Sequence, residues 1–141
     1  MKDNYFIDTN IFIYSFDKSN LIKSSKSQSI IAKSIETGNG FISAQVIQEF
    51  INVATKKFIT PIKNKDLKIY MKEILFPLCK IFPTFDLLEK SLEIYDRYKF
   101  SYYDCMIIAA AIQSGAKILL SEDLNNTQRI EGVTILNPFE T

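Results

Sequence analysis

The chain has 141 residues and a formal net charge of +1, with 17 Lys and Arg against 16 Asp and Glu. This length suits one domain over residues 1–141, and the balanced charge gives no overall basic field for nucleic acid. The sequence contains no histidine, which excludes Ser-His and Cys-His nucleophile pairs, a histidine general base and histidine-ligated zinc or haem.

The two cysteines and the N-terminus indicate where the protein resides. Cys79 and Cys105 each lie in an apolar run, as expected for small buried side chains in a reducing compartment. The N-terminus has no cationic region followed by an apolar core, and no apolar run approaches the ~20 residues of a membrane span. We therefore expect a cytoplasmic protein without a membrane partner.

The first half of the chain alternates short apolar runs with amphipathic segments. In chain order, we predict a strand at 5–7, a short helix at 11–16, a polar segment at 17–26, a helix ending at 38–40, a strand at 41–43 and an amphipathic helix at 44–57. The glycines at 38–40 suit a left-handed helix end. Pro61 then interrupts the pattern.

The second half continues this alternation. In chain order, we predict a helix at 63–75, a strand at 78–82, a helix at 86–98, a helix at 104–114, a strand at 117–123 and a strand at 133–136. Asp86 and Glu89 have the spacing of a capping box for the helix at 86–98. Alternating strands and helices with short connections predict a three-layer α/β/α sandwich with a mostly parallel sheet.

The unit from residue 104 to residue 123 has a helix and a strand of similar length. The helix is roughly 15 Å long at about 1.5 Å per residue, and the strand returns roughly 20 Å at about 3.3 Å per residue. The helix start and the strand end therefore lie at the same edge of the sheet. Asp104 and Asp123 are expected to be close in space.

Two further acids should lie at this edge. Asp8 directly follows the first strand, and Glu49 is in the second turn of the helix after the strand at 41–43. Helical side chains lean toward the N-terminus, so Glu49 can reach back to the edge. Four neighbouring carboxylates repel one another unless a cation neutralises them, and an all-oxygen cluster suits Mg²⁺ or Mn²⁺. This chemistry indicates metal-dependent phosphoryl hydrolysis.

Each acid also has a simpler interpretation. Asp8 can cap the short helix, Glu49 falls on a polar helix face, and Asp104 has capping-box spacing from Ser101. The fourth acid can end a strand in a polar turn. Strand alternation directs Ser121 and Asp123 to one side and Glu122 to the other, so spacing leaves open which acid faces the cleft.

Several motifs together resemble PIN-domain nucleases over essentially the whole chain. They are Phe6-Ile7-Asp8-Thr9-Asn10, Gln48-Glu49-Phe50, Tyr103-Asp104 before an Ala-rich helix, the segment 119–124 and the closing segment 132–139. A short domain of this kind is similar to the VapC-type toxins of toxin–antitoxin pairs. The resemblance implies a Mg²⁺- or Mn²⁺-dependent endoribonuclease, usually a homodimer. It also implies inhibition by a small antitoxin whose own domain binds DNA, so DNA would be contacted only through the antitoxin.

The resemblance also implies roles for individual residues. It maps the metal-binding and catalytic acids onto Asp8, Glu49, Asp104 and Asp123. It favours Asp123 over Glu122 as the fourth acid. Thr9, Asn10 and Ser121 are implied as supporting polar groups.

RNA contacts are less specific in the sequence. The lysines at 56, 57, 63, 65, 68 and 72 can contact phosphates, although a lysine-rich helix is usually a solvated face. Arg97, Tyr102 and Tyr103 lie near the start of the helix at 104–114 and can contact a base, although tyrosine pairs more often pack in a core.

Three alternatives compete with the nuclease hypothesis. Asp8 at a strand end is also typical of a phosphatase with an aspartyl nucleophile, which normally has a second Asp where Asn10 stands. A receiver-like or adaptor domain would use Asp8 or Asp123 as a modification or cation site and would catalyse no reaction. A PIN-like fold can also act only as an RNA- or protein-binding module, because fold does not determine function.

Overall fold

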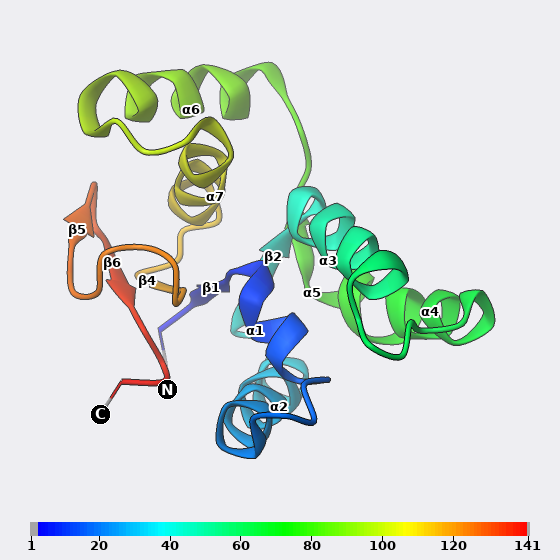
Figure 1. Cartoon of the computed structure of the whole chain (residues 1–141). Helices are drawn as coiled ribbons and strands as arrows, with labels where there is room; N and C mark the ends of the chain where they lie inside the picture. The colour runs from blue at the N-terminus through cyan, green and yellow to red at the C-terminus, as the bar shows by residue number, and fades with distance from the viewer. Residues whose placement is uncertain (1–2, 141) are drawn as a thin grey trace.

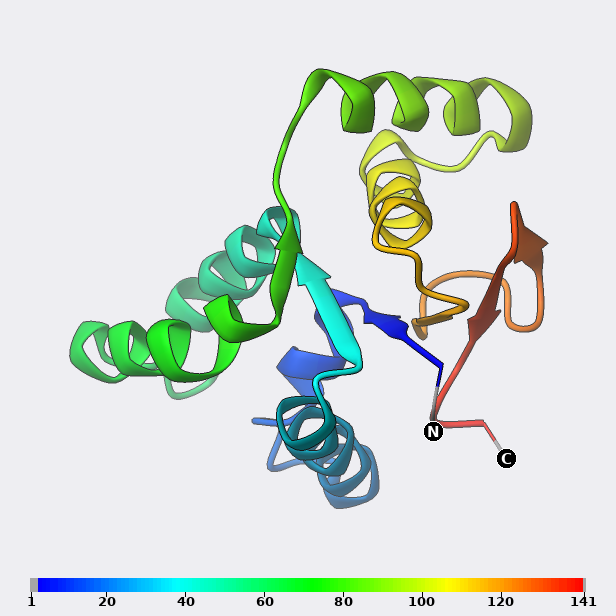
Figure 2. The ribbon, with the colours of Figure 1, turned by 180° about the vertical axis from the view of Figure 1, so that it is seen from behind.

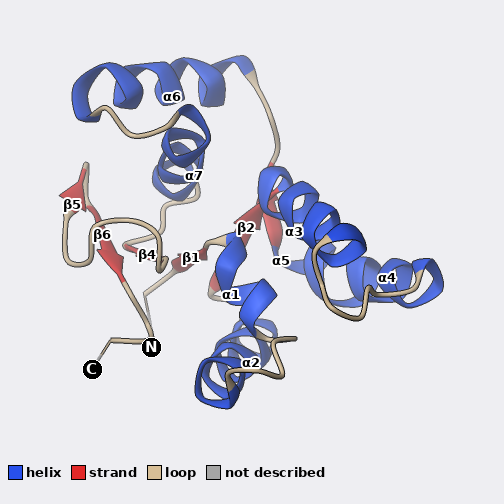
Figure 3. Cartoon of the chain, viewed as in Figure 1, coloured by secondary structure: helices blue, strands red, loops and turns tan. Residues whose placement is uncertain are grey.

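The computed structural model describes residues 3–140 and contains a central six-stranded sheet (Figures 1 and 3). The strands are β1 (Tyr5–Ile7), β2 (Gly40–Ser43), β3 (Cys79–Ile81), β4 (Ile118–Leu120), β5 (Arg129–Ile130) and β6 (Val133–Leu136). Their order across the sheet is β3-β2-β1-β4-β6-β5. Within the described sheet, β5 pairs antiparallel with β6 and every other pair is parallel. The predicted α/β class with a mostly parallel sheet is confirmed.

Helices lie on both faces of this sheet. They are α1 (Thr9–Tyr14), α2 (Leu21–Thr37), α3 (Ala44–Lys56), α4 (Asn64–Tyr70), the π-helical turn η1 (Met71–Leu75), α5 (Phe76–Leu78), α6 (Phe85–Tyr98) and α7 (Tyr102–Gln113). One face carries α7 with α6 packed across it, and the other face carries α2 (Figures 1 and 2). The sandwich therefore has the expected three layers. Within residues 3–140, no helix is both long and apolar enough to cross a membrane.

The core is densest at the middle of the sheet. All three residues of β1 are buried, as is Leu119 of β4, and α7 buries its apolar run from Ile107 to Ala111 above them. Burying an Ile, Leu or Phe side chain contributes about 1.5–3 kcal/mol. The two central strands are consequently held on both faces, so the residues at their carboxyl ends have fixed positions.

α2 contacts the sheet through small polar side chains rather than a wide apolar stripe. Ser27 and Ser34 are fully buried, and the Tyr5 hydroxyl lies 2.8 Å from Ser34 Oγ. A Cβ atom at Gly40 would collide with Ser34. Glycine at this position therefore allows α2 to pack closely on β2, after the helix has ended at Gly38 with a φ of +74°.

Two predicted helices have different bounds in the structure. The helix predicted at 63–75 is divided into α4 and the π-helical turn η1, and is followed by the short α5 that contains Pro77. The helix predicted at 86–98 begins one residue earlier, because Thr84 rather than Asp86 is its N-cap and accepts from Leu87 N at 3.1 Å.

The region after β4 also differs from the prediction. β4 ends at Leu120, so Glu122 and Asp123 lie beyond the strand and are not oriented by strand alternation. β5 was not predicted, because two residues are too few for a periodic pattern. It forms through a tight turn in which Glu131 and Gly132 have positive φ values of 48° and 88°.

Candidate active site

The site begins with two residues that follow paired strands. Ile7 of β1 is in register with Leu120 of β4, so the next residues, Asp8 and Ser121, are neighbours at the carboxyl edge. Asp8 N donates to Leu120 O at 3.0 Å, and Ser121 Oγ donates to Asp8 Oδ2 at 2.7 Å. The second Asp8 oxygen accepts from Thr9 N at 2.7 Å, so Asp8 is also the N-cap of α1. The capping role and the predicted site position therefore coexist in one carboxylate.

The Asp8 carboxyl has a strongly perturbed pKa. Burial raises this pKa from 3.8 to about 7, against the lowering effect of the hydrogen bonds from Ser121 and Thr9. The negative charges of Glu49 and Asp123 raise it further. A buried carboxyl surrounded by other carboxylates is a group that a cation would ionise.

The first turn of α1 connects Asp8 to two other acids. Thr9 Oγ1 donates to Glu49 Oε1 at 2.5 Å, and Asn10 Nδ2 donates to Asp123 Oδ2 at 3.0 Å. Both donors are buried. Among the described residues, the buried Asn10 Oδ1 has no hydrogen-bond partner. It is an unsatisfied acceptor directly beside the carboxylates.

Gln45 links the helices that carry the remaining acids. Its Nε2 donates to Tyr103 O at 3.0 Å and to Glu49 Oε2 at 3.3 Å, and so connects α3 to the first turn of α7. Asp104 lies in that turn, where its backbone N–H donates to Ser101 Oγ, the N-cap. Gln45 was not among the predicted site residues. Only its position one turn before Glu49 was available as a signal.

Four carboxylates from four separate segments line one cavity of about 270 Å³. Its lining residues are Asp8, Thr9, Asn10, Ile13, Glu49, Asn52, Val53, Asp104, Ile107 and Asp123. Seven of the eight residues proposed for the site, Arg97 being the exception, therefore line this cavity or, like Ser121, bond to an acid that does.

The cavity is better suited to a divalent ion that keeps some of its water ligands than to one bound entirely by protein ligands. Within residues 3–140, no three Asp, Glu or Cys side chains are grouped closely enough to hold a metal ion. The cavity nevertheless has an all-oxygen donor set, a carboxyl whose pKa is raised to about 7, and the unsatisfied Asn10 Oδ1. Mg²⁺ usually keeps several waters and binds few protein carboxylates directly. The residues present therefore fit an ion held partly through its water.

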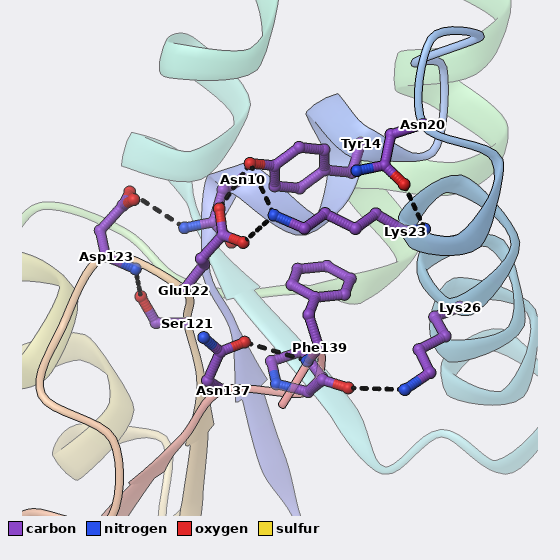
Figure 4. Close-up of polar contacts among 11 residues, drawn as sticks. Asn10, Tyr14, Asn20, Lys23, Lys26, Ser121, Glu122, Asp123, Asn137 and Phe139 are labelled. Atoms are coloured by element: carbon purple, nitrogen blue, oxygen red, sulfur yellow. Dashed lines mark hydrogen bonds and ion pairs between the residues drawn. The ribbon is translucent and has the colours of Figure 1, made fainter. Parts of the chain in front are cut away.

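Glu122 and Asp123 point in different directions (Figure 4). Asp123 lines the cavity, whereas Glu122 forms an ion pair with Lys23 and accepts from Tyr14 Oη at 2.5 Å. Burial acts to raise the pKa of Glu122, but donation from Lys23 and Tyr14 holds it below the ordinary value. Of the two acids that spacing left open, Asp123 is the one at the cavity.

Other predicted RNA-contacting residues lie outside the cavity. Arg97 is exposed in the last turn of α6 and does not line it. The rings of Tyr102 and Tyr103 contact each other, and Tyr103 is largely exposed. The lysines at 56, 57, 63, 65, 68 and 72 are all exposed on α3, α4 and their surroundings.

Comparisons with solved structures show a recurrent fold. A toxin–antitoxin complex from Klebsiella pneumoniae matches with a TM-score of 0.68 and 20% identity, covering 98% of this chain and 100% of that chain. FitAcB from Neisseria gonorrhoeae matches with a TM-score of 0.67 and 17% identity, covering 97% and 99%. VapC20 from Mycobacterium tuberculosis, a toxin that cleaves the sarcin–ricin loop, matches with a TM-score of 0.64 and 14% identity, covering 85% and 90%.

Sequence comparison identifies the family. No curated protein sequence matches the chain. The PIN domain family model matches residues 5–132, a segment that contains the four cavity acids and the polar residues that bond to them. The chain belongs to the PIN domain family.

Proposed function

We propose that the chain is a metal-dependent endoribonuclease that hydrolyses RNA phosphodiester bonds and acts as the toxin of a toxin–antitoxin pair. The observation that carries this proposal is the convergence of Asp8, Glu49, Asp104 and Asp123 on one cavity. These four acids would hold Mg²⁺ or Mn²⁺. When bound, such an ion supplies positive charge to the phosphodiester and lowers the pKa of an attacking water.

The chain's own residues orient these acids and control their protonation. Ser121 donates to Asp8, Thr9 to Glu49 and Asn10 to Asp123, so three of the four acids have at least one oxygen held by a hydrogen bond. Because the pKa of Asp8 is about 7, a proton competes with the cation at this carboxyl in neutral solution. Ile13, Val53 and Ile107 also line the cavity, and Asp8 is the buried member of the four acids, so water screens its charge least.

The proposed partners are an antitoxin protein, a second copy of the chain and an RNA substrate. Similar structures include a toxin–antitoxin complex and VapC20, a toxin that cleaves the sarcin–ricin loop, which supports the antitoxin and RNA assignments. VapBC2 from Rickettsia felis, which has a TM-score of 0.63 to this chain, is bound to a fragment of promoter DNA. By analogy, we expect this chain to reach DNA only through its antitoxin, and to form a homodimer.

The test is RNA cleavage by the purified protein with Mn²⁺ and with EDTA. Asp8→Asn and Asp104→Asn should each lower cleavage by about 100-fold or more while leaving the circular dichroism spectrum unchanged. Asp96→Asn is the control, because Asp96 is an exposed aspartate of α6 that does not line the cavity. Undiminished cleavage by Asp8→Asn would contradict the proposal. Accumulation of phosphorylated Asp8 would instead support an aspartyl-nucleophile phosphatase.

A further inference from the structure

Three consecutive residues after β4 have side chains with different partners, and Figure 4 shows those of Glu122 and Asp123. Ser121 is fully buried and donates to Asp8. Glu122 turns toward α1 and α2, while Asp123 turns to Asn10 and the cavity. A three-residue segment with side chains fixed in opposing directions has little freedom to rotate, so the attachment of one residue restricts its neighbours.

Glu122 is attached by two donors and an aromatic enclosure. Tyr14 Oη and Lys23 Nζ both donate to its carboxylate. The Lys23 ammonium lies 4.7 Å from the Tyr14 ring centroid and 5.3 Å from that of Phe139, and these two rings meet edge to face at 5.2 Å. An ammonium between two ring faces and a carboxylate gains cation–π attraction as well as the ion pair. The contact is therefore better defined than a single surface salt bridge.

Asp123, in contrast, is weakly held by its own side chain. It is exposed, and within residues 3–140 its carboxylate accepts one hydrogen bond, from Asn10. Asn10 and Tyr14 are one helical turn apart and lie on the same side of α1. The same helix thus binds Asp123 through Asn10 and Glu122 through Tyr14. Because one helix binds both adjacent acids, the position of Asp123 depends on the position of Glu122.

We propose that Glu122 is a positioning residue whose attachment to Tyr14 and Lys23 holds Asp123 in the candidate metal cavity. Glu122 itself does not touch the cavity, and acts on the reaction only through the backbone of Asp123. This role deepens the proposed nuclease function and rests on it. Glu122, which lies outside the cavity, would then determine how well Asp123 is positioned inside it.

The first experiment observes the position of Asp123 without metal or RNA. The two Asn10 Nδ2 protons, followed by ¹H–¹⁵N NMR, report the hydrogen bond between Asn10 and Asp123. In Glu122→Gln and Lys23→Met, these signals should move toward their positions in Asp123→Ala. Lys23→Arg keeps the positive charge over the two rings, and its signals should stay closer to those of the wild type than the signals of Lys23→Met. Unchanged Asn10 signals in both Glu122→Gln and Lys23→Met would overturn the proposal.

The matched control is a second ion pair of similar exposure on the opposite side of the fold. Lys90 of α6 binds Glu131 at 2.5 Å, with side-chain exposures of 24% and 33%, against 29% and 21% for Lys23 and Glu122. Lys90→Met should leave the Asn10 signals in place. Movement of these signals in Lys90→Met would show that they report general loosening and would refute a specific role for Glu122.

The second experiment is a double-mutant cycle on RNA cleavage with Mn²⁺. Lys23→Met should lower kcat by about tenfold with less than about twofold change in KM. In an Asp123→Ala background, the same substitution should have less than about a twofold effect, because the residue it positions is gone. Additive effects would refute action through Asp123. If the wild-type protein does not cleave RNA, the nuclease proposal fails, and the Asn10 signals still decide the role of Glu122.

Discussion

The two halves of the candidate site are built by different kinds of structure. Asp8 and Ser121 follow paired residues of two central strands, are buried, and bond directly to each other. Glu49, Asp104 and Asp123 come from helices and a loop and are more exposed. Glu49 accepts from Thr9 and Asp123 from Asn10, while Gln45 connects Glu49 to the backbone of Tyr103, the residue before Asp104. The strand half is fixed by the sheet. The helix and loop half is more exposed to solvent.

The largest expected difference between the halves is in the stability of the metal-free protein. The folded pKa of Asp8, about 7, exceeds its ordinary value of 3.8. The contribution of Asp8 to stability is therefore complete below about pH 4 and is lost as the pH rises through 7. Asp8→Asn should raise the free energy of unfolding at pH 8 by a few kcal/mol, roughly. Asp104→Asn should change it by less than about 0.5 kcal/mol.

Urea denaturation at pH 5 and pH 8 measures both variants. Wild type and Asp104→Asn should lose stability between these pH values, and Asp8→Asn should lose much less. If all three proteins show the same pH dependence, ionisation of the buried Asp8 does not destabilise the fold, and the contrast between the halves is wrong.

Stabilisation by Mn²⁺ should depend on acids from both halves of the site. At a concentration 100 times the dissociation constant, a cation that binds only the folded state adds about 2.7 kcal/mol to stability. We expect thermal unfolding of the wild type to shift upward with Mn²⁺, and that of Asp8→Asn and Asp123→Ala to shift much less. Equal shifts in Asp123→Ala and wild type would show that the loop half takes no part in binding the ion.

Ser121→Ala tests the strand half through its internal hydrogen bond. Among the effects on Asp8, the bond from Ser121 is the strongest one that lowers its pKa. Without this bond, the acid limb of the cleavage profile should move to higher pH, and stability should fall by about 1–2 kcal/mol. An unchanged acid limb would mean that a group other than Asp8 controls the reaction at low pH.

Gln45→Ala should have the smallest effect, because Gln45 makes two neutral-donor contacts of 3.0 and 3.3 Å near the surface. We expect a stability loss of about 0.5 kcal/mol and a two- to threefold loss of cleavage. The measurement is kcat beside denaturant unfolding. A loss as large as that of Ser121→Ala would show that the helix half is as tightly organised as the strand half.

The sequence was most informative where geometry follows from chain topology. Asp8 and Asp104 were assigned to one edge because strands in a parallel sheet end together and a helix returns the chain to that edge. The contacts of Glu122 were not predictable, because Tyr14 lies 108 positions away and its side-chain rotamer decides the bond. Strand alternation is not the reason that Asp123 and Glu122 point in different directions, since both residues lie past the end of β4.

The unequal lengths of the strands have a consequence for self-association. At one edge of the sheet, β5 has only two residues and carries the exposed Arg129; at the other, β3 carries the exposed Lys80 and lies between Pro77 and Pro83. Short, charged edges bounded by proline are poor templates for another strand. Chains of this protein should therefore resist joining edge to edge into continuous sheets.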